Sequence, residues 1–270
     1  MTDLPGPGTP VPSRLGVTAR FEDGQLILDL APQSRTLRHG VVRASVLSFL
    51  VDAVAGIPID TDPDVWSLTT DMTVRMRPVP APVRVTAVNR VLRHQRRSAT
   101  CQVELTSDTG APVAVGAIGF VHVPRKDTDG PKPDIAPERM VEMFHGLPTL
   151  TRPLRDEAGI EVVDAAAGVV QVDLQPELLN PAGTLQGAMV ALVAESAAEE
   201  LVETRFGSPA VVTDLDLRYL ARTHAGPVRT RSRLLGDGPG DPIQIELVDT
   251  STDTLTTLVY ARAVQVDATD

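Results

Sequence analysis

The stretch that decides the fold reads Ala188-Met189-Val190-Ala191-Leu192-Val193-Ala194-Glu195-Ser196-Ala197-Ala198-Glu199. Its alanine content, its length and the Gly and Pro residues before it favour a helix over a strand. Apolar residues would lie on every side of such a helix, which is typical of a helix that is buried. The stretch Val46-Leu47-Ser48-Phe49-Leu50-Val51-Asp52-Ala53-Val54-Ala55 has the same character. We therefore predict two buried central helices.

The two helical stretches belong to an internal repeat. The first half of the chain matches the second half without a gap at a shift of 143 residues, the difference between positions 52 and 195. A chain of 270 residues is long enough for two units that each bury a core. We predict one domain duplicated, in which polar differences between the halves are clues to function. The matched landmarks are Gly16 and Gly159, Gly40 and Gly183, Asp52 and Glu195, and Asp71 and Asp214.

Strand-like segments surround each predicted helix. Two segments of alternating residues precede the helix, and four follow it between Pro, Gly and Asp turns. This order predicts an α+β fold in which an antiparallel sheet curls around a helix. The segments are 16–21, 25–30, 70–77, 83–92, 99–106 and 113–123 in the first half, and 160–163, 168–174, 211–219, 228–235, 242–249 and 255–266 in the second.

A linker is expected between the two halves. Residues 126–134 are charged, contain prolines and lack an apolar period, which is typical of a linker. A short amphipathic helix is expected over 137–147. The expected divisions are a disordered leader (1–11), a first unit (12–125), a linker (126–148) and a second unit (149–270).

Composition limits the classes of function. The formal net charge is −10, the pI is near 5.0 and aromatic residues make up only 3%, which argues against a nucleic-acid partner. The single Cys101 permits no disulfide within the chain and no cysteine-rich metal site. The first ten residues lack the basic and apolar regions of a signal peptide, and no apolar window is long enough to span a bilayer. We expect a cytoplasmic protein with no membrane partner.

The segment most informative about function is Leu179-Asn180-Pro181-Ala182-Gly183-Thr184-Leu185-Gln186-Gly187-Ala188. A turn running into a helix leaves free backbone N–H groups at the positive end of the helix dipole, which suits a carbonyl oxygen that becomes negative. A glycine at position 187 lets a substrate approach the backbone. On spacing alone, the alternative is that Asn180 and Thr184 cap the helix and Gly187 permits tight packing.

The order of these residues resembles the hotdog-fold thioesterases of the phenylacetate-pathway type. Their pattern is Asn-x5-His-Gly-Gly with Asp or Glu nine residues after the His. Here Asn180, Gln186, Gly187 and Glu195 occupy the matching positions, with Gln for His and Ala188 for the second Gly. The resemblance covers residues 150–265 and, more weakly, 12–124. It implies a tandem hotdog fold: two antiparallel sheets, each wrapped around a central helix, that form a pseudo-dimer.

The first half departs from the motif. In the same register, Leu37 stands for Asn180, Arg43 for Gln186 and Ala44 for Gly187. His39 precedes Asp52 by thirteen residues instead of nine, so it is interpreted as a loop residue.

The spacing within one helix bears on where a site can form. Nine helical residues place Gln186 and Glu195 on roughly opposite sides of one helix. In the resembling family the helix start of one subunit meets the acid of the other. The resemblance therefore implies two unequal sites: Asn180, Gln186 and Gly187 with Asp52, and Arg43 and Ala44 with Glu195.

The first of these is expected to be the working site. There the Gly187 N–H would bind the thioester oxygen, Asp52 would act as nucleophile or as general base through a water, and Asn180 would orient the water or the acyl group. Glu195 is either a catalytic acid of the second site or a partner of Arg43 in a vestigial one. Thr69 and Arg43 are the candidates for substrate binding, and Thr69 is a weak one.

Three functions remain open from the sequence. The favoured one is an acyl-CoA thioesterase that needs no metal and no cofactor beyond the coenzyme A of its substrate. A hydratase or dehydratase on the same fold would need a histidine in the helix, and neither helical stretch contains one. A non-catalytic acyl-CoA-binding or assembly module is the third. The two-unit chain can also form a homodimer. Arg75, Arg77, Arg218 and Arg222 are read as solvated charges, some of which could meet coenzyme A phosphates.

Overall fold

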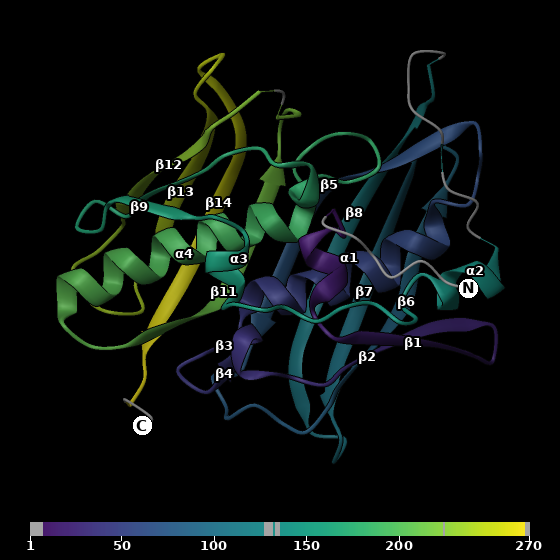
Figure 1. Ribbon diagram of the computed structural model, residues 1–270, viewed down its shortest axis with the longest axis horizontal. Coiled ribbons are helices and arrows are strands. Elements are labelled where there is room, and N and C mark those ends of the chain that lie inside the picture. Colours follow the sequence, from purple (N-terminus) through teal and green to yellow (C-terminus); the bar gives the residue numbers. More distant parts are fainter. Residues whose placement is uncertain (1–7, 127–131, 133–135, 224, 268–270) are drawn as a thin grey trace.

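The computed structural model describes residues 8–126, 132, 136–223 and 225–267, and its largest feature is one antiparallel sheet. Twelve strands follow the order β1-β2-β6-β7-β8-β5-β11-β14-β13-β12-β10-β9 (Figure 1). The six strands of the first half therefore lie together and are followed by the six equivalent strands of the second half in reverse order. Strands β3 and β4 form a separate pair.

The elements of the first half are η1 (Val11–Arg14), β1 (Val17–Glu22), β2 (Gln25–Leu30), η2 (Ser34–Thr36), β3 (Leu37–Arg38), β4 (Val41–Val42), α1 (Ala44–Ile59), β5 (Val65–Met76), β6 (Val85–Gln95), β7 (Ser98–Ser107) and β8 (Pro112–Pro124). Those of the second half are α2 (Pro137–Glu142), α3 (Leu154–Glu157), β9 (Glu161–Asp164), β10 (Val169–Val172), η3 (Pro176–Leu178), α4 (Gly187–Phe206), β11 (Ala210–Tyr219), β12 (Val228–Leu234), β13 (Ile243–Asp249) and β14 (Thr254–Gln265). The α+β class and both central helices are confirmed.

The expectation of two separate sheets is wrong. Strands β5 and β11 pair in antiparallel register from Asp71↔Arg218 to Arg75↔Asp214, and this pairing joins the halves into one sheet. An unpaired strand edge leaves backbone N–H and C=O groups without partners. Joining β5 to β11 removes one such edge from each half.

The two long helices lie on the same face of the sheet and pack against each other (Figure 1). Their contacts are reciprocal: the start of α4 meets Asp52 in the middle of α1, and the start of α1 meets Glu195 in the middle of α4. Each helix is thus covered by the sheet on one side and by its partner on another. This explains why residues 188–199 are all buried and why their apolar residues occupy every side.

Small residues set the distance between helix and sheet. Gly116 on β8 faces Val51 on α1, and a Cβ added at Gly116 would lie only 2.5 Å from a Val51 methyl group. The core around this contact is aliphatic, as the shortage of aromatic residues requires. The helix can therefore approach β8 only because residue 116 has no side chain.

The connecting segments differ in part from the expected divisions. Residues 1–7 of the expected leader lie outside the described residues, but Val11 is buried and begins η1, so ordered chain starts before residue 12. Helix α2 falls within the range expected for a short helix. No helix within the described ranges combines the length and apolarity needed to span a membrane.

We predict that Gly116→Ala destabilises the protein. The added methyl group must displace Val51, and overpacking of this kind costs about 1–3 kcal/mol of unfolding free energy. Urea unfolding measures the loss. Ala117→Val, on the exposed face of the same strand, is the control and is expected to change little. Adding Val51→Ala to Gly116→Ala should restore part of the loss, and a loss that persists in full would contradict the packing explanation.

Candidate active site

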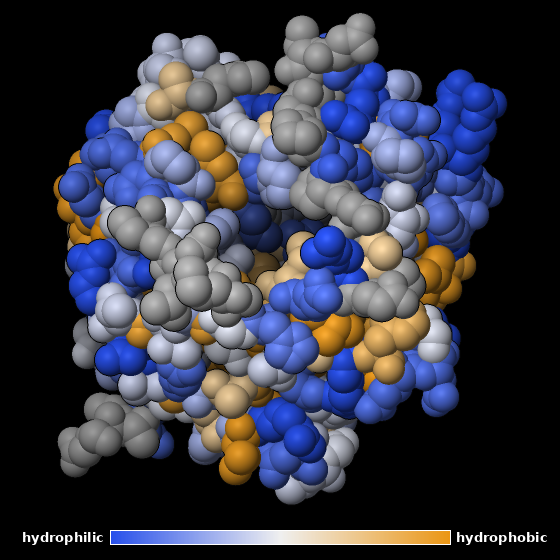
Figure 2. All heavy atoms as spheres, turned by 45° about the vertical axis from the view of Figure 1, so that its right-hand side comes forward, coloured by the Kyte–Doolittle hydropathy of each residue, from blue (hydrophilic) through white to orange (hydrophobic). Residues whose placement is uncertain are grey.

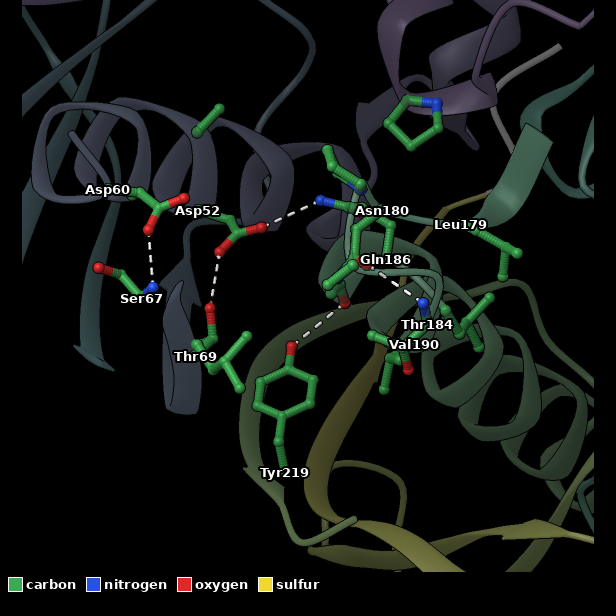
Figure 3. A pocket seen from close by; sticks show the side chains of 18 of the residues that line it. Asp52, Asp60, Ser67, Thr69, Leu179, Asn180, Thr184, Gln186, Val190 and Tyr219 are labelled. Carbon is green, nitrogen blue, oxygen red and sulfur yellow. Dashed lines mark hydrogen bonds between the residues drawn. The ribbon is translucent and has the colours of Figure 1, made fainter. Parts of the chain in front are cut away.

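A cavity of about 650 Å³ lies where the middle of α1 meets the turn that precedes α4. Its wall takes residues from both halves. They include Phe49, Asp52 and Gly56 of α1, residues 66–70 of β5, 179–182 and 184–187 before and at the start of α4, and 219–223 at and after the end of β11. The surface is hollowed near the centre of Figure 2, where apolar and hydrophilic side chains meet. Figure 3 shows part of the wall from close by, with Asp52, Thr69, Gln186 and Tyr219 labelled.

Asp52 is held by one residue of each half. Thr69 on β5 donates its hydroxyl to Oδ1 at 3.1 Å, and Gln186 donates Nε2 to Oδ2 at 3.0 Å (Figure 3). Both donors are uncharged, so burial dominates and raises the pKa of Asp52 to about 6, although the Thr69 hydrogen bond opposes the rise. A carboxyl group with such a pKa exchanges protons readily near neutral pH.

Gln186 also caps α4. Its Oε1 accepts hydrogen bonds from the backbone N–H groups of Ala188, at 2.7 Å, and Met189, at 3.3 Å. No described residue accepts a hydrogen bond from the N–H of Gly187. A single residue thus orients the carboxylate and satisfies the next two N–H groups of the helix. The N–H of Gly187 remains available at the positive end of the helix dipole.

The space beside Gly187 is narrow. A Cβ at this position would lie 3.2 Å from the Tyr219 hydroxyl oxygen and 3.5 Å from Asp52 Oδ2. The absence of a side chain therefore keeps the helix start accessible from the cavity.

Asn180 lies in the cavity wall but forms no hydrogen bond with Asp52. Its Oδ1 accepts the Thr184 N–H at 3.2 Å, and its own N–H donates to the Thr184 carbonyl at 2.8 Å. Asn180 therefore holds the turn in shape. Its Nδ2 has no hydrogen-bond partner among the described residues and is a donor that the turn does not consume.

Tyr219 is a site residue that the sequence analysis missed. Its hydroxyl group donates to the carbonyl of Gly187 at 3.2 Å and belongs to the same cavity wall. Burial and the nearby Asp52 carboxylate raise the pKa of Tyr219 well above its usual value. It remains a neutral donor at every physiological pH. Met76 stands at the matching position of the first half, a polar difference between the repeats that could have identified Tyr219.

The matching position in the other half has a different structure. The Glu195 side chain accepts the Ala44 N–H at 2.7 Å through Oε1 and the Ser45 hydroxyl group at 2.5 Å through Oε2. The Glu195 carboxylate therefore accepts the hydrogen bond of the Ala44 N–H, which is the group that corresponds to the free N–H of Gly187. Glu195 is only 1% exposed and does not line the cavity.

Arg43, expected to bind substrate, is instead buried at this second position and does not line the cavity. Its guanidinium lies 3.3 Å from Glu195 and 3.1 Å from Glu199, and all three side chains are buried. Burial alone would lower the pKa of Arg43, but the two carboxylates outweigh it and raise that pKa. Burial raises the pKa of Glu199 to about 7 against the opposing effect of Arg43. Glu199 corresponds to Gly56, which lines the cavity of the other half.

The remaining candidates separate into two groups. Thr69 lies at the site, as its hydrogen bond to Asp52 demonstrates. His39 has a left-handed φ of 48° in its loop and bonds Glu203, not the cavity. Arg75 and Arg218 pair with Asp214 and Asp216 on the sheet, and Arg77 reaches the Pro112 carbonyl. Arg222 alone among the four arginines lines the cavity.

The sequence matches no family model and no curated protein. Solved structures do match over nearly the whole chain. A candidate thioesterase II from Thermobifida fusca covers 97% of this chain and 99% of its own, with a TM-score of 0.64 and 18% identity. A hot-dog-fold protein of unknown function from Alicyclobacillus acidocaldarius covers 96% and 99%, with a TM-score of 0.62 and 13% identity.

A third match is the 12:0-ACP thioesterase from Umbellularia californica. It covers 93% of this chain and 98% of its own, with a TM-score of 0.60 and 11% identity. Identities this low establish the fold and nothing finer. The hotdog fold expected from the motif is thereby confirmed, whereas the phenylacetate-pathway type stays a prediction.

We predict that Arg43→Met strongly destabilises the protein. The substitution leaves Glu195 and Glu199 buried without their cation, and breaking a buried ion pair in this way costs about 3–5 kcal/mol. Chemical denaturation measures the loss. Arg139→Met removes an exposed pair with Glu142 and should cost less than about 1 kcal/mol. Equal losses in the two variants would contradict a buried structural role for Arg43.

Proposed function

We propose that this chain is a thioesterase that hydrolyses an acyl-CoA at a single site shared by the two halves. The observation that carries the proposal is the free N–H of Gly187 beside the carboxylate of Asp52, both in the wall of one cavity. A donor at a helix start and a base with a pKa near 6 are the two groups that thioester hydrolysis requires. The likeness to solved thioesterases supports the reaction class.

The proposed mechanism begins with the thioester carbonyl oxygen hydrogen-bonded to the Gly187 N–H. Asp52 takes a proton from a water held with the help of Asn180, and the resulting hydroxide attacks the carbonyl carbon. Negative charge then develops on the oxygen, where the helix dipole and the N–H stabilise it. Collapse of the tetrahedral intermediate breaks the C–S bond, and the protonated Asp52 returns its proton to the leaving thiolate.

The general-base role is favoured over direct attack by Asp52 on the carbonyl carbon. Each oxygen of the carboxylate already accepts a hydrogen bond, one from Thr69 and one from Gln186. These bonds fix its orientation and reduce its nucleophilicity, while the raised pKa improves it as a base. The reaction as proposed needs no metal and no further cofactor.

Gln186, Tyr219 and Thr69 are positioning residues in this proposal. Gln186 and Thr69 orient the base, and Tyr219 holds the carbonyl of Gly187 from behind. Glu195 and Arg43 are proposed to be structural, because the carboxylate of Glu195 blocks the N–H that a second site would need. The two halves are proposed to act as the two subunits of a hotdog dimer within one chain.

We predict that Asp52→Asn abolishes thiol release without unfolding the protein. Loss of a general base lowers kcat by roughly 10²–10⁴-fold. The pKa of Asp52 is about 6 in the fold against an ordinary value of 3.8, so above pH 6 its ionised form opposes folding. At pH 7 the variant is therefore expected to unfold at a temperature equal to or above that of the wild type.

The experiment measures free thiol released from short, long and aromatic acyl-CoA substrates, together with thermal unfolding. Glu195→Gln is the repeat-matched control and should keep activity. Full activity of Asp52→Asn would reject the proposed base. Absence of thiol release by the wild type across the panel would favour a non-catalytic acyl-CoA-binding module.

We predict that in Thr69→Val the fall of kcat at acidic pH begins at a higher pH than in the wild type. The base acts when ionised, so activity should fall as pH drops through about 6. The Thr69 hydroxyl stabilises the ionised carboxylate, and its removal raises the pKa of Asp52. Thr73→Val, on the same strand but bonded to Asp216, should leave the pH of this fall unchanged. A fall that begins at a lower pH would contradict the assignment.

A further inference from the structure

A second carboxyl group lines the cavity, at the end of α1. Asp60 follows the last residue of this helix and lies eight residues after Asp52. Eight helical residues span about 12 Å along the helix axis and bring the two side chains back to the same side of the helix. In Figure 3 both carboxyl groups project from α1 toward β5. The helix residues that line the cavity between them are apolar: Ala53, Gly56 and Ile57. The cavity therefore extends from the proposed catalytic centre to a second polar end.

One oxygen of Asp60 is engaged and the other is not. Oδ1 accepts the Ser67 N–H at 2.6 Å and the Lys132 ammonium group at 2.8 Å. The other two protons of this ammonium group go to the carbonyls of Asp62 and Val65, both at 2.7 Å, so Lys132 has none left for Oδ2. No described residue donates a hydrogen bond to Oδ2, which lies on the side of Asp52 in Figure 3. Oδ2 is therefore a free acceptor in the cavity wall.

The same carboxylate contact occurs in the other half of the chain. Glu203 corresponds to Asp60 at the shift of 143 residues, and Ala210 corresponds to Ser67. The Ala210 N–H donates to Glu203 at 3.0 Å, as the Ser67 N–H donates to Asp60. In each half this bond joins the end region of the long helix to the strand that follows it. The halves differ in how the rest of each carboxylate is used.

The rest of the Glu203 carboxylate is filled from within the chain. The Arg38 guanidinium donates to Oε2 at 2.6 Å, and the His39 ring lies 2.9 Å from Oε1. The residues that correspond to these two are Pro181 and Ala182, which carry no polar side chain and line the cavity. The second half therefore brings no equivalent donor to the cavity, and a bound ligand is left to supply it.

We propose that this end of the cavity recognises a hydroxyl group at the far end of the acyl chain, which donates its hydrogen bond to Asp60 Oδ2. This inference rests on the proposed function and names its substrate class, thioesters of ω-hydroxy fatty acids. Each carbon–carbon bond of about 1.5 Å advances an extended chain by roughly 1.3 Å, so a span of about 12 Å corresponds to roughly eight to ten carbon atoms. The apolar wall between the two carboxyl groups then contacts the methylene groups.

A neutral donor fits this position better than a methyl group or an ion. A methyl end would bury Oδ2 without a hydrogen-bond partner, which costs free energy. An ammonium end would add a second cation where Lys132 already balances Asp60. A carboxylate end would place a negative charge and a second acceptor against Oδ2. A hydroxyl group supplies one donor and adds no charge.

The first experiment measures kcat/KM for the CoA thioesters of decanoic, 10-hydroxydecanoic and 10-methoxydecanoic acid. The methoxy oxygen accepts hydrogen bonds but donates none. The wild type should prefer the hydroxyl compound about tenfold over both others. An equal or higher kcat/KM for decanoyl-CoA would overturn the inference and leave the thioesterase proposal standing.

Asp60→Asn tests the acceptor itself. The amide oxygen can still accept the Ser67 N–H, while the amide NH2 group takes the place of Oδ2 and donates. The preference for the hydroxyl over the methoxy compound should therefore fall about tenfold. This ratio compares two substrates on one protein, so a smaller folded fraction does not change it.

Glu203→Gln is the repeat-matched control. It changes the same charge in the equivalent contact, outside the cavity, and should leave the preference unchanged. An unchanged preference in Asp60→Asn, or an equal loss in both variants, would overturn the role of Asp60.

Pro181→Arg copies the donor of the other half. The new guanidinium should bond Asp60 as Arg38 bonds Glu203, and the preference for the hydroxyl compound should disappear. Pro181→Met adds a side chain without a donor and should keep the preference. A preference that survives in Pro181→Arg would contradict the free acceptor.

The last experiment measures binding without turnover. Calorimetry compares the thioethers decyl-CoA and 10-hydroxydecyl-CoA on the wild type and on Asp52→Asn. The hydroxyl compound should bind about tenfold more tightly to both proteins. Tighter binding without hydrolysis of any thioester would support the site at Asp60 and reject the catalytic proposal. Equal Kd values together with hydrolysis would overturn the site at Asp60 alone.

Discussion

The structure depends on the contact between the start of each buried helix and the carboxylate in the middle of the other. A helix start carries unsatisfied N–H groups and a partial positive charge, and neither can be buried without an acceptor. At the start of α1 the acceptor is Glu195 of α4. At the start of α4 the acceptor is its own Gln186, whose side chain donates in turn to Asp52 of α1, so the two helices can pack side by side beneath one sheet. The same contact fixes a carboxylate beside backbone donors, which is the arrangement that a hydrolytic site needs.

The repeat uses this contact in two ways, and side-chain length decides between them. The longer Glu195 reaches the Ala44 N–H directly, so that position is satisfied from within. The shorter Asp52 bonds the Gln186 side chain instead, and the Gly187 N–H remains free. Gly56 then keeps the space beside Asp52 open, whereas Glu199 at the matching position fills it. One half therefore retains a cavity and the other a buried ion cluster.

Periodicity and the gapless repeat predicted the helices and the meander of strands, and the resemblance to the hotdog family implied the pairing of Asp52 with the turn at 180–187. It did not find the single sheet, since pairing of β5 with β11 depends on how two units meet and leaves no trace in local pattern. Tyr219 was missed because a tyrosine near a strand end is ordinary until the strand is placed beside Gly187. The buried state of Glu199 likewise follows only from its contact with Arg43.

The difference between Gln186 and Arg43 changes the pKa of the neighbouring carboxylate as well as the packing. An arginine beside a buried carboxylate stabilises the ionised form and lowers the pKa of the carboxylate, which binds the halves together but weakens it as a base. Glutamine supplies a hydrogen bond of similar reach without the charge, so burial can keep the pKa of Asp52 near 6. The contact between Asp52 and the start of α4 is therefore made by a neutral donor, Gln186, in place of a cation. In the other half the cation is present, and Arg43 lies between the buried carboxylates of Glu195 and Glu199.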